Sequence, residues 1–237
     1  MTADSTRFQE YSKPHFPVRN IMQCGTTKKM TKIETTSFTR RHLPHWRVLD
    51  RPYFITFRLK NTIPEDIVIE LNSERIRLEQ AKANQEEIDK FEQYKFTKIE
   101  FILDNLNNDL CYLNNPKIAA LVVNSFNFIE KNFKWIFPCF TVMPNHVHCL
   151  AVKQPDTEVS VEVALGSLKQ HVSHEANKIL GTKGRMWCDE NYDHWCRTPE
   201  SVEKIIKYIK NNPVKAGIID DWRDWKWTVC HPSWNEI

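Results

Sequence analysis

The stretch WIFPCFTVMPNHVHCLAV, residues 135–152, decides most of what the chain predicts about its fold. Two apolar runs, 135–143 and 146–152, flank Pro144 and Asn145, and a Pro-Asn pair between two such runs favours a tight turn. We therefore expect two antiparallel strands joined as a hairpin. Side chains alternate between the two faces of a strand, so His146 and His148 share one face while Val147 points to the other, into the core.

The segments around this hairpin predict a sheet covered by helices. A run of β-branched and aromatic residues at 53–59 predicts a strand, whereas residues 96–103 fit a strand or a helix equally well. Helical spacing and end signals predict one or two helices over 66–94, and single helices over 117–131, 161–180 (ended by Gly181) and 200–212 (stopped by Pro213). The order predicts an α+β fold, a ferredoxin-like antiparallel sheet with helices packed on one face.

Composition sets the class of protein. Of 237 residues, 41% are hydrophobic and 27% charged, which is typical of a globular chain. Residues 1–39 are polar and predict an N-terminal arm, and residues 40–237 predict one domain with a Trp-rich C-terminal tail. The apolar runs are far shorter than the ~20 residues that span a bilayer. The first ten residues lack the apolar core of a signal peptide, so we expect a cytoplasmic protein without a membrane partner.

The cysteines and glycines argue against several kinds of site, and the net charge leaves a nucleic-acid partner open. Seven cysteines without a C-x-x-C pair argue against a disulfide framework and a zinc knuckle. Five glycines and no Gly-rich phosphate loop argue against a nucleotide cofactor. The net charge of +3 is compatible with a nucleic-acid partner but does not require one.

His146 and His148 are the first candidate site residues. Two imidazoles side by side on a strand form half of a metal site, although a pair of hydrogen-bonded surface histidines has the same spacing. Tyr208 and Asn212 are the second candidates, because residues four apart on a helix share a face. Tyr208 is a potential nucleophile and Asn212 a potential amide-oxygen ligand. A packed tyrosine and a helix-capping asparagine fit the same pattern.

Three longer segments resemble a known family. They are VMPNHVHCLAV (142–152), SLKQHVSHEANKILG (167–181) and MWCDENYDHWCRTPESVEKIIKYIKNNPVKAGII (186–219), and RRHLPHWRVLDRPYFITFRL (40–59) adds to them. Together they resemble the IS200-like, single-tyrosine HUH transposases of bacteria, and more closely the REP-associated tyrosine transposases. The resemblance covers residues 40 to about 230. Cys149 replaces a usual Leu, and Cys188 replaces a common Gln, but neither is a candidate ligand.

The resemblance implies a single-strand DNA endonuclease and strand transferase that acts at hairpin, REP-like elements. It assigns Tyr208 as the catalytic residue that forms a 5′-phosphotyrosine, and His146, His148 and Asn212 as ligands of Mg²⁺ or Mn²⁺. It also implies a nucleoid-associated monomer or homodimer. Basic residues expected near the DNA are Arg40, Arg41, His45, Lys169, Arg197 and Lys215.

Two other functions fit the same residues. The chain could be a regulator that binds hairpin DNA without cutting it, or a metal-dependent nuclease in which water attacks and Tyr208 is structural. Nicking, hairpin binding and a covalent protein–DNA adduct distinguish these three functions.

Overall fold

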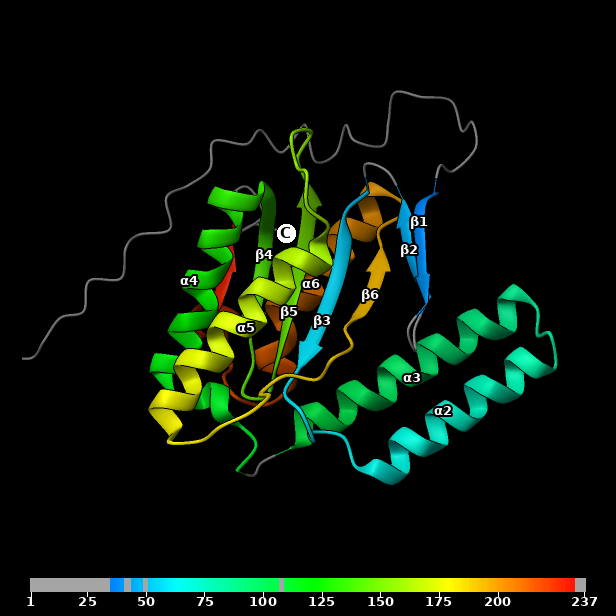
Figure 1. Cartoon of the computed structure of the whole chain (residues 1–237), viewed down its shortest axis with the longest axis horizontal. Helices are drawn as coiled ribbons and strands as arrows, with labels where there is room; N and C mark the ends of the chain where they lie inside the picture. Colours follow the sequence, from blue (N-terminus) through cyan, green and yellow to red (C-terminus); the bar gives the residue numbers. More distant parts are fainter. Residues whose placement is uncertain (1–34, 41–43, 49–50, 107–108, 233–237) are drawn as a thin grey trace, which may run out of the picture.

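A computed structural model describes residues 35–40, 44–48, 51–106 and 109–232 (Figure 1). Its centre is a five-stranded antiparallel sheet in the order β6-β3-β5-β4-β7, and β1 and β2 form a separate two-stranded sheet. The strands are β1 (Thr35–Arg40), β2 (Pro44–Val48), β3 (Tyr53–Arg58), β4 (Trp135–Val142), β5 (His146–Lys153), β6 (Tyr192–Trp195) and β7 (Thr228–Cys230).

Helices surround this sheet. They are α2 (Glu65–Gln80), α3 (Gln85–Asn105), α4 (Pro116–Phe133), α5 (Val161–Leu180) and α6 (Pro199–Lys215), with short 3₁₀ helices at Tyr112–Asn114 and Trp222–Asp224. The expected α+β class and the hairpin at 135–152 are therefore confirmed. Leu113 N donates to Pro144 O, which ties the hairpin turn to the segment before α4.

The two faces of the sheet bury two separate cores. Val147, Cys149 and Ala151 of β5 pack with α4 and α5, whereas Leu150 and Val152 pack with α6. Figure 1 shows α5 in front of the sheet and α6 behind it. The helices α4 and α5 share one face, as expected, and α6 adds a second helical layer on the other face. His146 and His148 belong to the α6 side, because they alternate in phase with Leu150.

Helix ends follow the local signals except at α6. Helix α5 spans 161–180, with Ser160 at its N-cap and Gly181 in the left-handed conformation after it, as predicted. The prediction that Pro213 stops α6 at Asn212 is wrong, because the helix continues to Lys215. Pro213 is buried. Since it removes only one backbone donor in the last turn, its packing outweighs the lost hydrogen bond.

The structure shows what forms in several segments that the sequence left open or did not predict. Residues 96–103 belong to α3, so the ambiguous segment is helical. The short edge strands β6 and β7 were not predicted, and β6 lies in the expected link between α5 and α6. β1 crosses the expected boundary at residue 40, while residues 1–34 lie outside the described chain, so the extent of an arm stays a prediction. Among the described helices, none is long and apolar enough to cross a membrane.

Candidate active site

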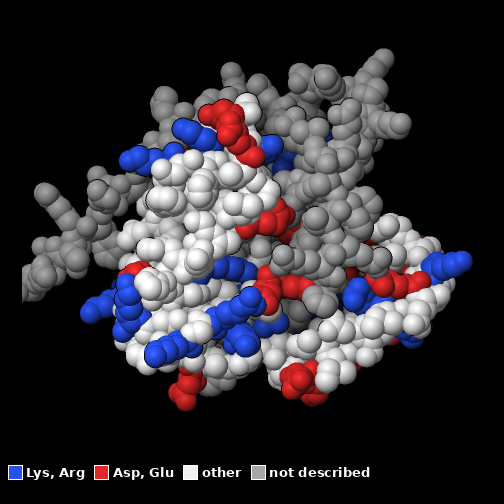
Figure 2. Space-filling model, viewed as in Figure 1, with Lys and Arg blue, Asp and Glu red and all other residues white. Residues whose placement is uncertain are grey.

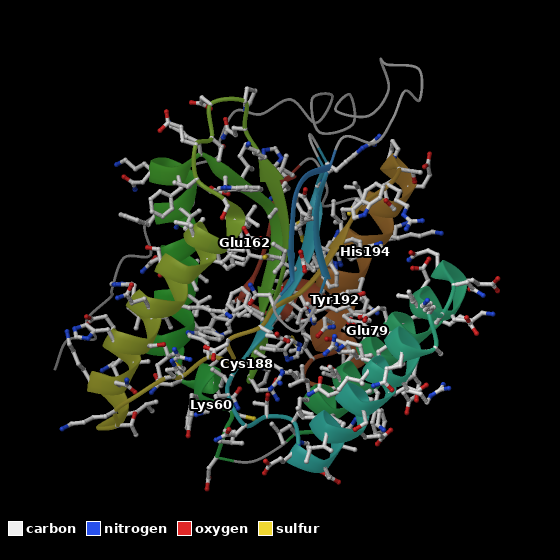
Figure 3. The ribbon with its side chains drawn as sticks, turned by 45° about the vertical axis from the view of Figure 1, so that its right-hand side comes forward. Lys60, Glu79, Glu162, Cys188, Tyr192 and His194 are labelled. Atoms are coloured by element: carbon white, nitrogen blue, oxygen red, sulfur yellow. The ribbon has the colours of Figure 1, made fainter. Side chains whose placement is uncertain are left out.

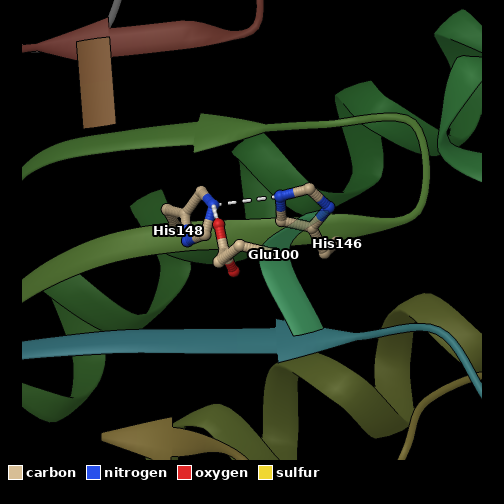
Figure 4. A group of neighbouring side chains, drawn as sticks. All are labelled: Glu100, His146 and His148. Carbon is tan, nitrogen blue, oxygen red and sulfur yellow. Dashed lines mark hydrogen bonds and ion pairs between the residues drawn. The ribbon is translucent and has the colours of Figure 1, made fainter. Parts of the chain in front are cut away.

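The two strand histidines face each other within the α6 side of the sheet. His146 and His148 are fully buried, and their Nε2 atoms lie 2.9 Å apart. Residue spacing alone placed them on one face, and the strand geometry of β5 brings both rings into one cluster (Figure 4). They are therefore not a solvent-exposed surface pair.

Hydrogen bonds behind the rings fix the tautomer of His146. Asn145 Nδ2 donates to Leu103 O at 2.9 Å, so Asn145 Oδ1 is the acceptor for His146 Nδ1 at 2.6 Å. The proton of neutral His146 is thus on Nδ1, and its Nε2 carries a lone pair. Burial, followed by the neighbouring His148, lowers the pKa of His146 to about 3, which keeps the ring neutral.

A second bond orients His148. Thr56 lies opposite His148 in the β3–β5 ladder, and its Oγ1 is 2.7 Å from His148 Nδ1. When Nδ1 donates to Thr56, His148 also presents a lone pair at Nε2. Two such lone pairs 2.9 Å apart repel each other unless a proton or a cation lies against them.

Glu100 is a site residue that the sequence analysis missed. It lies on α3, is 2% exposed, and its Oε2 is 3.1 Å from His148 Nε2 (Figure 4). Burial would raise the pKa of this carboxyl, but His148, its hydrogen bond, His146 and Tyr208 together lower it to about 2. The carboxylate is thus negative beside two imidazoles. Its other oxygen, Oε1, has no hydrogen-bond partner among the described residues.

Tyr208 reaches the same cluster from α6. Its hydroxyl donates to Glu100 Oε2, and its ring packs against His148 and Phe54 at centroid distances of 5.4 and 5.6 Å. Burial, and then the Glu100 charge, raise the pKa of the Tyr208 hydroxyl far above its usual range. The structure therefore holds the hydroxyl protonated and oriented, and a nucleophilic role requires nearby positive charge.

Asn212 completes the cluster one turn later on α6. It is 1% exposed, and it lies close enough to affect the pKa of both His146 and Tyr208. Neither its Oδ1 nor its Nδ2 makes a hydrogen bond with the described residues. A buried amide with both atoms unpaired is costly, which indicates that a missing group satisfies it.

These residues fit a divalent cation. Glu100, His146 and His148 offer ligand atoms within 4.8 Å of one another, and the unpaired Asn212 oxygen lies beside them. Contacts of 2.9 and 3.1 Å between neighbouring ligand atoms are close to the ~3 Å edge of an octahedron with bonds of about 2.1 Å. Within the described residues this is the one such cluster of His, Cys, Asp and Glu.

His174 and the basic candidates lie outside this cluster, and one of them, Lys215, is adjacent to it. His174 is 70% exposed and pairs with Glu175 rather than with a buried cluster. Arg41 lies outside the described residues, and Arg40 and His45 lie in β1 and β2, where only the backbone is described. Lys215 pairs with Asp104 at 2.8 Å and lies 5.8 Å from the Tyr208 ring centroid, so it is adjacent to the cluster.

Two further basic candidates have structural partners. Lys169 donates to Cys188 O and Asn191 Oδ1, and burial lowers its pKa to about 8. Arg197 is exposed and stacks over Trp195 at 5.2 Å. Figure 2 shows Lys and Arg side chains gathered over the lower half of the face covered by α5. A role of any of these residues in DNA binding stays a prediction.

The chain is similar to known proteins over a segment that contains most of these residues. Residues 112–212 match the family model described as "Transposase IS200 like". Over 122 residues the chain is 22% identical to a putative REP-associated tyrosine transposase of Haemophilus influenzae, covering 46% of this chain and 69% of that protein. A solved structure of a REP-associated tyrosine transposase bound to a REP hairpin aligns with 81% of each chain, at 15% identity and a TM-score of 0.42.

The family match confirms the resemblance that the motifs predicted. The matched segment contains His146, His148, Tyr208 and Asn212, the four residues that the sequence proposed for the site. Glu100 precedes the matched segment. The fifth residue of the cluster therefore comes from a helix outside the part of the chain that matches the family.

Proposed function

We propose that the chain, whose residues 112–212 match the IS200-like transposase family, is a REP-associated tyrosine transposase that cleaves and rejoins single-stranded DNA at hairpin elements. The observation that carries this proposal is the contact of Tyr208 with Glu100 inside the His146–His148 cluster. A nucleophile, a carboxylate and two imidazoles meet in one buried place.

Tyr208 and Glu100 have different roles in the proposed DNA cleavage step. Tyr208 Oη attacks the scissile phosphorus, the Oη–P bond forms, and the bond to the 3′ oxygen breaks. Glu100 accepts the tyrosine proton, and the departing 3′ oxygen takes a proton from water. The product is a 5′-phosphotyrosine and a free 3′-OH, whose phosphoester energy is retained for rejoining without a nucleotide.

His146, His148, Glu100 and Asn212 would hold the Mg²⁺ or Mn²⁺. When bound, the ion supplies charge neutralisation at a non-bridging phosphate oxygen. Thr56 and Asn145 orient the two imidazoles so that each Nε2 faces the ligand position. Phe54 and the ring of His148 restrict the Tyr208 side chain, which aligns its hydroxyl for in-line attack.

Tyr208→Phe tests the nucleophile. The variant should form no covalent adduct with a labelled single-stranded oligonucleotide carrying a hairpin, in the presence of Mn²⁺, and should still bind it. A denaturing gel reports adduct and cleavage together. Tyr94→Phe, at a 51% exposed tyrosine on α3, is the matched control and should behave as the unaltered chain.

The same gel separates the other two functions. Cleavage without an adduct in the unaltered chain would assign the attack to water. Hairpin binding without cleavage would make the protein a regulator. Continued adduct formation by Tyr208→Phe would show that another residue is the nucleophile.

A further inference from the structure

A cavity of about 390 Å³ lies next to the catalytic cluster, between β3, the helices α2 and α3, and the segment 185–192. It shares Glu100 and Thr56 with the candidate active site. Figure 3 labels three of the lining residues, Lys60, Cys188 and Tyr192. The cavity lies within the range of about 300–1,000 Å³ that is typical of ligand pockets.

Aromatic side chains form one wall of the cavity. The rings of Phe96 and Tyr192 lie 4.5 Å apart at an angle of 30°, and both are only partly buried. Trp187 also lines the cavity, and its buried indole N–H has no hydrogen-bond acceptor among the described residues. Aromatic rings of this kind stack on nucleobases without strong sequence preference.

Positive side chains also line the cavity. Arg58 donates to Thr62 Oγ1, and Lys95 makes no salt bridge or hydrogen bond with another described residue. Burial, the largest effect, lowers the pKa of both, while Glu190 on the same lining opposes that shift. The lining holds four basic side chains against three carboxylates, and Arg185 pairs with Asp189. The basic excess leaves room for a single phosphate, whose attraction to Lys95 and Arg58 strengthens as water is excluded.

We propose that this cavity holds one nucleotide of the single-stranded substrate beside the scissile phosphate, with its base on Phe96 and Tyr192 and its phosphate on Lys95 and Arg58. The proposal rests on the proposed function. A nucleotide fits better than a free small anion because the cavity offers aromatic surface beside the basic side chains and shares Glu100 with the catalytic cluster.

Photo-crosslinking tests the location. The full-length protein is irradiated with single-stranded oligonucleotides of mixed sequence that carry 5-iododeoxyuridine, and mass spectrometry identifies the attached residues. We expect crosslinks at Trp187 or Tyr192, or at Phe96 on α3. Crosslinks confined to other parts of the chain, with DNA bound, would overturn the proposal.

Lys95→Gln tests the phosphate contact. Each phosphate contact to single-stranded DNA adds roughly 0.7 to the slope of log affinity against log salt, so this variant should lower the slope by about 0.7. Lys90→Gln, on the same helix but away from this cavity and paired with Glu86, is the matched control and should leave the slope unchanged. An unchanged slope in Lys95→Gln would contradict the phosphate contact.

The two proposals fail in different ways. If no Tyr208 adduct forms but crosslinks still map to the cavity, the cleavage function is wrong and the cavity binds the DNA of a non-cleaving protein. If the adduct forms and crosslinks avoid the cavity, the cleavage function stands and the nucleotide site is wrong.

Discussion

At the scale of single residues, Glu100 joins two tasks in one carboxylate. It faces the imidazole nitrogen of His148 and accepts the hydrogen bond of Tyr208. In the proposed reaction, a negative group at this place would strengthen cation binding and take the tyrosine proton. It also raises the pKa of the Tyr208 hydroxyl when no cation is present. The balance between these effects decides whether the tyrosine can attack.

Replacing the carboxylate by an amide tests both tasks. Glu100→Gln keeps the size of the side chain but removes its charge, so Mn²⁺ affinity should fall at least about tenfold and adduct formation should fall with it. Titration calorimetry with Mn²⁺ measures the first effect independently of DNA. Glu86→Gln, at an exposed glutamate on the same helix, is the control. Unchanged Mn²⁺ affinity in Glu100→Gln would remove this residue from the ligand set.

Residue patterns could identify four of the five site residues but not the fifth. The His-Val-His spacing and the Tyr208–Asn212 spacing are local, so strand and helix periodicity predicts which side chains share a face. Glu100 lies 46 positions before His146, and no spacing rule connects them. Glu100 lies between the apolar residues Phe96 and Leu103, and on a helix these three side chains share one face. This pattern could indicate a buried glutamate only if residues 96–103 were known to be helical.

At the scale of secondary structure elements, helix bounds were predicted correctly where the capping residues and the hydrophobic periodicity indicate the same ends. Helix α5 has both, and its bounds were predicted correctly. Strands β6 and β7 have four and three residues, and their pairing with β3 and β4 depends on contacts distant in the chain. The same holds for α3, whose position over the site depends on the pairs Lys215–Asp104 and Tyr208–Glu100 with α6.

Lys169 makes the link between α5 and the segment before β6 dependent on pH. Burial lowers its pKa from 10.5 in an ordinary lysine to about 8, so between these values the unfolded chain binds more protons than the folded one. Stability from this group therefore rises with pH across that window, and the cost of burying the charge is fully present below pH 8.

Lys169→Met should remove this pH dependence. The free energy of unfolding of the unaltered chain, relative to the variant, should increase by up to the order of 3 kcal/mol as the pH rises through the window. Urea unfolding of both proteins at several pH values measures it. Lys178→Met, at a 59% exposed lysine on the same helix, is the control. A difference that stays constant with pH would show that Lys169 does not titrate there.

At the scale of the whole molecule, the candidate metal site connects segments that are distant in the chain. Glu100 lies on α3, the histidines on β5 and Asn212 on α6, so an ion bound to all four would hold α3 and α6 against the sheet. An ion that binds only the folded state stabilises it by about 2.7 kcal/mol at a concentration of 100 times its dissociation constant. Mn²⁺ should therefore raise the melting temperature of the DNA-free protein, and a chelator should reverse the rise.

Two histidine variants determine whether this stabilisation comes from the buried cluster. His148→Ala should lose the Mn²⁺-dependent rise in melting temperature, because it removes a ligand from the centre of the site. His174→Ala should keep it, since that side chain is 70% exposed on α5, away from the buried cluster. A rise that persists in His148→Ala and disappears in His174→Ala would place the ion on α5. Thermal scans with and without Mn²⁺ need no DNA substrate, so they test the metal site even if the cleavage reaction is assigned incorrectly.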